Sequence, residues 1–534
     1  MPFVADLRLR LLASRVASGC RQLGMLLLGW TLLSAHVGTN QVVFEGRAGG
    51  YPVRVMIDPP GVVPAQVPIT VRVLEGTPTR VTVRAAQWNV GTKGAPPAEA
   101  AAIVPGENGL WAHDLWIMTS ASYAVYVAVE GPAGNGSVLV PMQTSATRML
   151  GMKRGMGVML VALGTLLVAG MLTIIGAAAR EGTLAAGEAP SPTRLRRGRV
   201  AMGAGAVILS LALMGGRAWW SAEESWYKRR MQQPIAMTAS VSTLSDAASG
   251  SILTMAVTDS LWRTNRLGQL LPDHGKLMHL FLARIDQPEL VIAHLHPLRV
   301  QADTFVTRVP PMPAGSYLLF GDVLFDSGRQ RTLVDTVALS APDVPGTGTG
   351  AGSGVPAALP VLDADDAWRV MAAVSLGSAA PLAGGGTLTL RADSPPTEKR
   401  DLRLVVDVVE QDGSRSTLEP YMGMQGHAMV LRADAGVFLH LHPMGTASMT
   451  AQAQLARLER GDSTARDAAS LQVALDAEMS HAAHGGMPGS ESSALAFPFA
   501  FPSAGNYVVF VQVKRRGLVE TAAFRVTVPA RTTN

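Results

Sequence analysis

The sequence predicts a mainly β protein with three β-sandwich domains, a two-helix transmembrane hairpin and an N-terminal signal or anchor helix. Three observations support this fold class. Runs that alternate between apolar and polar residues recur in three separate blocks, as expected for half-buried strands. Two long apolar runs without charges lie between the first and second blocks. The second and third blocks share a sequence pattern, which indicates an internal repeat.

Residues 1–38 have the layout of an export signal. Several arginines precede an apolar stretch from Met25 to Val37, and a basic segment followed by an apolar one is typical of such signals. The stretch is short for a membrane span, and no small-residue cleavage site follows it. Two alternatives stay open, a removed signal peptide and a retained signal anchor.

Residues 40–146 form the first predicted sandwich. Alternating patterns run through Val67–Leu74, Thr79–Ala85 and Tyr123–Val129, and Gly134-Asn135-Gly136 has the composition of a hairpin turn. Short strands separated by turns favour a small, exported, immunoglobulin-like sandwich.

Two apolar segments, 155–179 and 200–220, are long enough to cross a bilayer as helices. The arginine-rich segment 180–199 joins them. Its basic residues are nearly matched in number by those on the outer flanks of the two apolar segments, so charge does not settle the orientation. An exported N-terminus would place 180–199 in the cytoplasm and both flanking regions outside. We therefore expect a protein of the bacterial inner membrane whose domains face the periplasm.

Charge and cysteine content argue against a nucleic-acid partner and against a thiolate metal site. The net charge is +5, and the basic residues gather beside the apolar segments and not with aromatic residues on one face, so no nucleic-acid partner is expected. The only cysteine is Cys20, inside the predicted signal. A metal in the exported part would therefore be held by His, Met or carboxylate ligands.

The C-terminal half contains the repeat. Residues 245–340 form repeat 1, 341–358 are a Gly-rich linker, and 360–530 form repeat 2. An Ala-, Ser- and Gly-rich insertion occupies 445–494, with helical character from Ala451 to Leu475. His481, His484 and Met487 lie in this insertion, where weak metal capture and a solvated loop are equally plausible.

Three segments of the repeats align in the same order, each without an internal gap. Leu271–His279 aligns with Glu419–His427, His294–Pro297 with His440–Pro443 (both His-Leu-His-Pro), and Ala314–Phe320 with Ala504–Phe510 (both Ala-Gly-x-Tyr-x-x-Phe). The last segment needs only a structural explanation, because a glycine turn followed by Tyr and Phe is typical of a sandwich core.

The histidines are predicted to converge on one face of each hairpin. A turn at 433–436 would place Met429 opposite His440 and His427 opposite His442. In repeat 1, Phe281 would lie opposite His294, and His279 opposite His296. Opposed side chains about 5 Å apart allow imidazoles to share one ion at about 2 Å.

Loop residues add further donors, and the set favours copper. Imidazole with thioether and without thiolate suits Cu(I) or Cu(II), and zinc is the second choice because it gives methionine no role. The alternative is that the histidines are structural and the methionines fill the core. The predicted ligands are His274, His279, His294 and His296 in repeat 1, and Met422, Met424, Met429, His427, His440 and His442 in repeat 2.

The two repeats resemble exported copper-binding domains of bacteria. The His-Leu-His-Pro and Ala-Gly-x-Tyr segments look like those of cupredoxin-like or immunoglobulin-like domains, including the YtkA-like family. The resemblance covers under half of the chain and implies a β-sandwich that handles copper. Blue-copper members of the cupredoxin fold use a Cys ligand, which the repeats lack, so an electron-transfer centre of that type is not expected.

Three hypotheses of function follow. The first is a non-enzymatic, membrane-anchored periplasmic protein that captures or transfers copper, serving other copper-handling or oxidase-assembly proteins. The second is a metal-dependent enzyme with a three-histidine site. It predicts an acid or base group beside the site, and Ala428–Arg432 and Val437–Leu441 contain no Asp or Glu. The third is an envelope assembly or scaffold protein with structural histidines.

Overall fold

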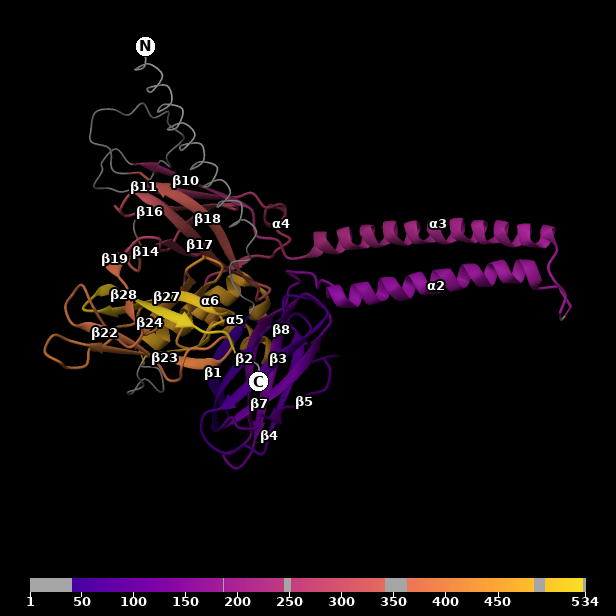
Figure 1. The fold of residues 1–534 in the computed structure, drawn as a ribbon. Helices are drawn as coiled ribbons and strands as arrows, with labels where there is room; N and C mark the ends of the chain where they lie inside the picture. Colours follow the sequence, from indigo (N-terminus) through magenta and orange to yellow (C-terminus); the bar gives the residue numbers. More distant parts are fainter. Residues whose placement is uncertain (1–40, 186, 244–250, 341–362, 485–494, 532–534) are drawn as a thin grey trace, which may run out of the picture. The chain divides into compact units, whose positions relative to one another are not determined.

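The computed structural model describes residues 41–185, 187–243, 251–340, 363–484 and 495–531 (Figure 1). The predicted N-terminal helix and the Gly-rich linker lie outside these residues. The chain divides into two units, Ala146–Gln233 and the remainder. The structure confirms a mainly β protein of antiparallel sheets with two long apolar helices.

The N-terminal block consists of two sheets that share one hydrophobic core. One sheet has the order β1-β2-β3-β7-β6 and the other β5-β4-β8-β9. Their apolar faces meet in a cluster that includes Val55 and Val127, both 0% exposed. The strands are β1 (Val42–Ala48), β2 (Tyr51–Ile57), β3 (Ala65–Val73), β4 (Arg80–Gln87), β5 (Glu99–Ala100), β6 (Ala102–Ile103), β7 (Leu110–Ile117), β8 (Ser122–Glu130) and β9 (Gly136–Gln143).

Repeat 1 also forms two sheets around one core. Their orders are β10-β11-β16-β15 and β12-β17-β13-β14-β19, with β18 on β17. Leu253 and Leu282 represent the two sides of the core. The elements are β10 (Met237–Thr243), β11 (Ser251–Val257), α4 (Ser260–Arg263), β12 (Leu270–Leu271), β13 (His279–Arg284), β14 (Glu289–Leu295), β15 (Leu298–Gln301), β16 (Thr304–Val309), β17 (Gly315–Phe325), β18 (Gln330–Leu339) and β19 (Ala367–Ala372).

Repeat 2 has the sheet orders β20-β28-β27-β24-β25 and β21-β22-β23-β26. Its core contains Leu404 and Val430 from the two sheets. The strands are β20 (Val374–Ser375), β21 (Ala379–Pro381), β22 (Thr387–Ala392), β23 (Asp401–Val409), β24 (Gly426–Arg432), β25 (Phe438–Leu441), β26 (Ala496–Ala500), β27 (Gly505–Arg515) and β28 (Leu518–Val528).

One strand differs from its predicted place. Strand β19 lies in the segment assigned to repeat 2, yet it pairs with β14 of repeat 1 from Glu289↔Ala372 to His294↔Ala367. Without β19 the edge of the β14 strand would be unpaired, and an unpaired edge readily accepts another strand. Repeat 2 begins with β20, which pairs in parallel with β28.

The two repeats have matching backbones at the aligned segments. His274 and Gly275 have φ values of 52° and 78°, and Met422 and Gly423 have 50° and 77°. Each pair occupies the centre of a tight turn with φ above zero at both positions, which glycine accommodates at the second. The alignment therefore corresponds to a structural repeat.

The two aligned tyrosines are core residues. Tyr317 is 0% exposed and Tyr507 is 1% exposed. Each hydroxyl donates to the carbonyl oxygen four residues earlier, at 2.6 Å to Pro313 and 2.8 Å to Ser503. These contacts agree with the structural explanation of the Ala-Gly-x-Tyr segment.

The insertion is helical, as expected from Ala451 to Leu475. It contains α5 (Met449–Glu459), the 3₁₀ helix η2 (Ser463–Arg466) and α6 (Ala468–His484). Leu455 and Leu471 pack with Trp88 of the N-terminal block and Leu324 of repeat 1. The insertion thus contacts both other blocks. The side chains of His481, His484 and Met487 lie outside the described part of the chain.

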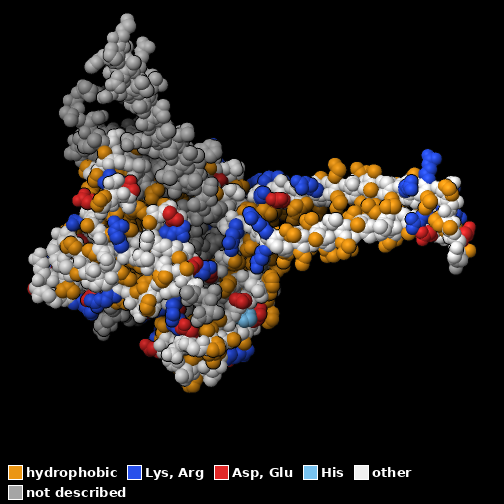
Figure 2. All heavy atoms as spheres, viewed as in Figure 1, with side chains coloured by type: hydrophobic (Ala, Val, Ile, Leu, Met, Phe, Trp, Pro, Cys, Tyr) orange, Lys and Arg blue, Asp and Glu red, His pale blue; other side chains and the backbone are white. Residues whose placement is uncertain are grey.

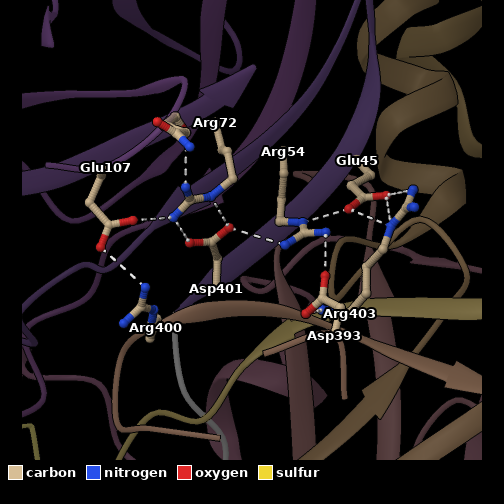
Figure 3. Close-up of polar contacts among 9 residues, drawn as sticks. Glu45, Arg54, Arg72, Glu107, Asp393, Arg400, Asp401 and Arg403 are labelled. Atoms are coloured by element: carbon tan, nitrogen blue, oxygen red, sulfur yellow. Dashed lines mark hydrogen bonds and ion pairs between the residues drawn. The ribbon is translucent and has the colours of Figure 1, made fainter. Parts of the chain in front are cut away.

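Charged residues join the N-terminal block to repeat 2 (Figure 3). Asp401 accepts from Arg54 Nη1 at 3.1 Å and from Arg72 Nε at 2.8 Å. Burial opposes ionisation of Asp401, but Arg72 and Arg54 hold its pKa below the usual value. Arg403 of repeat 2 in turn contacts Glu45 on β1, at 2.9 Å.

The second unit is a pair of helices, α2 (Arg154–Glu181) and α3 (Pro192–Arg230), each long and apolar enough to cross a membrane. Hydrophobic side chains cover the pair along its length, with Lys and Arg near the ends (Figure 2). Gly176, Gly198 and Gly205 are buried between the helices, and small residues allow such close approach.

The connecting loop is shorter than the predicted 180–199. Helix α2 continues to Glu181, and α3 begins at Pro192, where the Ser191 side chain accepts from the Arg194 amide at 3.4 Å. Ser followed by Pro is a common helix start. Arg180 therefore lies in the last turn of α2, and Arg194, Arg196, Arg197 and Arg199 lie on the first turns of α3. The helix also continues beyond 220 to Arg230.

Candidate metal centre

The hairpin registers place the histidines on the predicted faces. Met429 pairs with His440 in repeat 2, and Phe281 pairs with His294 in repeat 1. Leu441, between His440 and His442, is 0% exposed in the core of repeat 2. Because successive strand residues point to opposite faces, the histidines lie on the side of the sheet away from that core.

These two histidine-bearing faces pack against each other. Phe281 of repeat 1 and Phe438 of repeat 2 belong to one apolar cluster between the repeats, and Phe320 stacks on Phe438 with ring centroids 4.3 Å apart. The histidines of the two hairpins and of the turn at His274 are all buried. Sequence analysis had treated each repeat as a separate site, because nothing local in the sequence indicates that the two faces meet.

The result is one group of seven imidazoles, which we call the histidine cluster. Its members are His274, His279, His294, His296, His427, His440 and His442, each at most 8% exposed. Seven of the eleven histidines in the chain are thus gathered at one interface.

The first part of the cluster is built by repeat 1 alone. His279, His294 and His296 each offer a ring nitrogen within 4.8 Å of the other two. Their ring centroids are 4.7–5.4 Å apart. Three converging imidazoles at this spacing match a three-histidine metal site.

Hydrogen bonds orient all three of these rings. His279 Nε2–H donates to the Asp273 carbonyl at 3.0 Å, and His296 Nδ1–H donates to Asp366 Oδ1 at 2.9 Å. His294 Nδ1–H donates to Gln512 Oε1 at 2.9 Å. Such contacts fix the tautomer and leave the opposite nitrogen of each ring able to bind a metal.

The amide of Gln512 is itself oriented by Thr521. Its Nε2 donates to Thr521 Oγ1 at 3.2 Å, so its oxygen faces His294. In these tautomers His279 Nδ1 and His294 Nε2 both present lone pairs, 3.1 Å apart. A metal ion about 2 Å from each nitrogen would make an N–metal–N angle of roughly 100°. Two lone pairs that face each other with nothing between them repel.

The second part of the cluster combines both repeats. His274 of repeat 1 lies beside His427 and His442 of repeat 2, and all three offer nitrogens within 4.8 Å of one another. His274 is 4.7 Å from His442 between ring centroids. His440 lies next to this group. Its ring centroid is 4.6 Å from that of His442 and 5.1 Å from that of His279.

Burial keeps the imidazoles neutral. It lowers the pKa of His274 to about 3 and of His279 to about 4. It also lowers the pKa of His442 and holds those of His294, His296, His427 and His440 well below the usual value. A neutral imidazole is the form that binds metal, so the cluster has its ligands ready at neutral pH.

Acidic residues that sequence analysis missed lie beside the cluster. A pocket lined by Asp273 and Asp322 also contains His279 and His440. Burial raises the pKa of Asp322 to about 7. In the strand register, Asp322 lies opposite His279 on the neighbouring strand, as Gln512 lies opposite His427. Extending the repeat alignment by two residues beyond Phe320 and Phe510 would have identified both.

A second missed group follows the linker. Asp363 and Asp366 lie close enough to His296 to form a further set of metal-binding type. Asp363 is paired with Lys276 at 2.5 Å, and Asp366 orients His296. The segment containing these carboxylates reaches His296 because β19 pairs with repeat 1, which local sequence patterns do not indicate.

The three predicted methionine ligands occupy different surroundings. Met429 is 1% exposed in the apolar cluster between the repeats, among side chains that account for it as packing. Met422 and Met424 are each 8% exposed in the tight turn closed by Tyr421↔Met424.

The N-terminal block holds the loop that follows His442. Strand β1 continues into this loop: the Glu45 amide donates to the Met444 carbonyl, and the Thr446 amide to the Val43 carbonyl, both at 2.9 Å. A Cβ at Gly445 would lie 1.9 Å from the Val43 oxygen, and Gly445 has φ of 119°. Only glycine allows this contact, which fixes the backbone beside His442.

Comparison with known proteins gives little further information. No curated protein matches the chain. Among solved structures, similarity is found to dimeric latent PorU from Porphyromonas gingivalis (8% identity, 92% of this chain, 34% of that chain, TM-score 0.14). Similarity is also found to an ICAM-5 D1–D4 ectodomain fragment (9% identity, 90% of this chain, 83% of that chain, TM-score 0.13). TM-scores this low support no conclusion about fold or function.

One protein-family model matches part of the chain. It covers residues 382–530, which is most of repeat 2 and includes His427, His440 and His442. The family that this segment resembles is described as a domain of unknown function (DUF8832).

Proposed function

We propose that this is a membrane-anchored periplasmic protein that binds copper in the histidine cluster and captures or transfers it without catalysing a reaction. One observation carries the proposal. Both ring nitrogens of His427, and Nε2 of His274, His296 and His440, have no hydrogen-bond partner among the described residues. Buried polar atoms are normally satisfied, and a metal ion would satisfy several of these at once.

The structural alternative explains the cluster less well. Histidines that only support a sheet would be expected to use both nitrogens in hydrogen bonds when buried. His427 uses neither within the described chain, and it is 0% exposed. Leaving such groups unsatisfied costs roughly 1–3 kcal/mol each, which is hard to reconcile with a purely structural role.

Copper is the preferred metal because of its ligands. Divalent copper binds nitrogen sites more tightly than the other first-row metals, and Cu(I) accepts imidazole and thioether. The resemblance of the repeats to cupredoxin-like and YtkA-like copper-binding domains points the same way. Zinc also fits three histidines and is the second choice. We further infer that the three sheet pairs are three sandwich domains, and that other copper-handling or oxidase-assembly proteins are the partners.

A metal-dependent enzyme is the second candidate, favoured by Asp322. The segments Ala428–Arg432 and Val437–Leu441 contain no Asp or Glu, but β17 brings Asp322 into the pocket that contains His279 and His440. A carboxyl group with a pKa of about 7 suits general acid–base catalysis at neutral pH.

The test is metal binding by the full-length chain in detergent. After metal removal, the protein is offered Cu(I), Cu(II) or zinc, and retained metal is measured after competition with a chelator. We expect copper to be retained and to displace zinc. The His294→Gln/His427→Gln double variant should lose this retention, while His113→Ala, at a surface histidine that contacts Glu99, should not. Equal loss from both variants, or no retained metal in the wild type, would contradict the proposal.

A further inference from the structure

We infer that the histidine cluster holds two metal ions, one for each repeat, and that each site is completed by a turn residue of the opposite repeat. His274 of repeat 1 completes the site of repeat 2, and Met422 of repeat 2 completes the site of repeat 1. This inference rests on the proposed function and adds the number of ions and the identity of the exchanged ligands.

We infer an approximate two-fold relation between the repeats at the cluster from the distances between aligned residues. In the alignment His279 corresponds to His427, and His294 to His440. The ring centroids of His279 and His440 are 5.1 Å apart, and those of the corresponding pair, His427 and His294, are 6.2 Å apart. Similar distances for exchanged partners are expected of a symmetric interface.

Each repeat contributes a similar set of three imidazoles. In repeat 1, His279, His294 and His296 have centroid distances of 5.4, 5.2 and 4.7 Å. In repeat 2, the corresponding distances among His427, His440 and His442 are 5.3, 5.6 and 4.6 Å. One ion at about 2 Å from its ligands cannot reach all the rings. The two groups whose nitrogens converge, His279 with His294 and His296, and His274 with His427 and His442, therefore give two places for an ion.

The exchange of turn residues is seen directly in one direction. His274 belongs to repeat 1, but its nitrogen groups with those of His427 and His442. Its ring centroid is 5.6 Å from His427 and 6.1 Å from His279 of its own repeat. The turn of repeat 1 therefore reaches the site of repeat 2.

The other direction follows from the symmetry and from one contact. Met422 occupies the position of His274, with the same backbone conformation. The residue before it, Tyr421, places its hydroxyl 3.3 Å from His294 Nδ1 of repeat 1. The turn of repeat 2 thus reaches the imidazoles of repeat 1, and the inferred two-fold relation would put Met422 beside His279 and His296.

The two sites would differ in their chemistry. The site of repeat 2 would have nitrogen ligands only, because the exchanged residue is His274. The site of repeat 1 would add the thioether of Met422, and soft sulfur ligands favour Cu(I). One cluster would thus contain an ion site for either copper state and a neighbouring site biased toward Cu(I).

The experiment counts copper ions and measures affinity in the full-length chain. All variants carry His481→Ala and His484→Ala, so that the insertion supplies no imidazole. The matched variants His279→Gln and His427→Gln each remove one site, and we expect two ions per chain in the parent and one in each variant. His296→Gln and His442→Gln serve as second variants if circular dichroism of either first variant shows misfolding.

The exchanged ligands are tested with one site left. In the His427→Gln background, Met422→Leu should weaken Cu(I) binding at least about tenfold, because even replacing a residue that only supports a metal ligand has an effect of this size. In the His279→Gln background, His274→Leu should weaken Cu(II) binding to a similar extent. Met118→Leu, at a methionine that is 65% exposed in the N-terminal block, is the control and should have no effect in either background.

The outcomes separate this inference from the proposed function. A parent chain that retains no copper contradicts both. A parent that retains one ion, or loses all copper in either single-site variant, contradicts the two-ion arrangement and leaves copper binding standing. Two ions with unchanged affinity after Met422→Leu or His274→Leu would contradict the exchange of turn residues.

Discussion

Each imidazole of the histidine cluster has been removed from water in its neutral form. The cost is reduced where a protein group accepts a hydrogen bond, as Gln512 does for His294. It is not reduced for His427, whose nitrogens have no partner among the described residues. Under the proposed function, a residue of this kind would destabilise the metal-free protein and stabilise the metal-bound one, because metal binding contributes to folding free energy.

The same residues should make the metal-free protein sensitive to acid. Their pKa values in the folded state lie below about 6.5, the unfolded value, and reach about 3 for His274 and about 4 for His279. The stabilisation they allow is therefore fully present above pH 6.5. As pH falls below it, the unfolded chain takes up protons that the folded chain does not, at about 1.4 kcal/mol per group and pH unit.

Two carboxyl groups act in the opposite direction. Burial raises the pKa of Asp322 to about 7 and of Asp366 to about 6, so each stabilises the fold as pH falls toward its unfolded value. Seven histidines outweigh two carboxyls. We expect the melting temperature of the metal-free full-length chain to fall between pH 7.5 and 5.5, and the fall to be smaller in His427→Leu. A melting temperature that rises or stays constant over this range would contradict the neutral cluster.

At the scale of elements, the His-Leu-His hairpin separates ligand from core. Leu441 lies in the core of repeat 2, and His442 lies on the other face, 0% exposed. The opposing repeat covers it, and truncation of His442 to alanine would therefore create a cavity as well.

We expect Leu441→Ala and His442→Gln to have opposite effects. Leu441→Ala should lower the free energy of unfolding by roughly 2–5 kcal/mol while copper binding at room temperature is retained. His442→Gln keeps the volume and a polar group, so it should weaken copper binding with a smaller change in stability. Chemical unfolding and copper titration of both full-length variants test this. If His442→Gln unfolds the metal-free chain and leaves copper binding unchanged, the hairpin has been misinterpreted.

At the scale of the whole molecule, contacts from other parts of the chain hold the two repeats together. The insertion packs on the N-terminal block and repeat 1, and β1 pairs with the loop beyond His442. The cluster therefore depends on most of the chain, so metal binding has to be measured on the full-length protein.

The helix pair gives a prediction of topology. Two spanning helices return the chain to the side from which it entered, and an exported N-terminus makes that side the periplasm. Alkaline phosphatase fused after residue 145 or 240 should be active, and fused near residue 190 inactive. Activity at 190, or different activities at 145 and 240, would contradict this arrangement.

The sequence by itself determined the features that depend on neighbouring residues. Strand alternation, the turn at 433–436 and the pairing of Met429 with His440 follow from local spacing, because side chains alternate with a period of two and turn residues fix the register. The repeat also follows from sequence, and with it the seven histidines of the cluster.

Only the tertiary structure decided how those histidines combine. His294 and its partner Gln512 are 218 residues apart, and His274 lies beside His442 of the other repeat. Such contacts depend on which sheet faces pack together. The local alternation of residues shows which face of a strand is apolar, but it does not show which other face that one packs against. The choice among them is made by shape and burial over the whole molecule, which turned two predicted sites into one cluster.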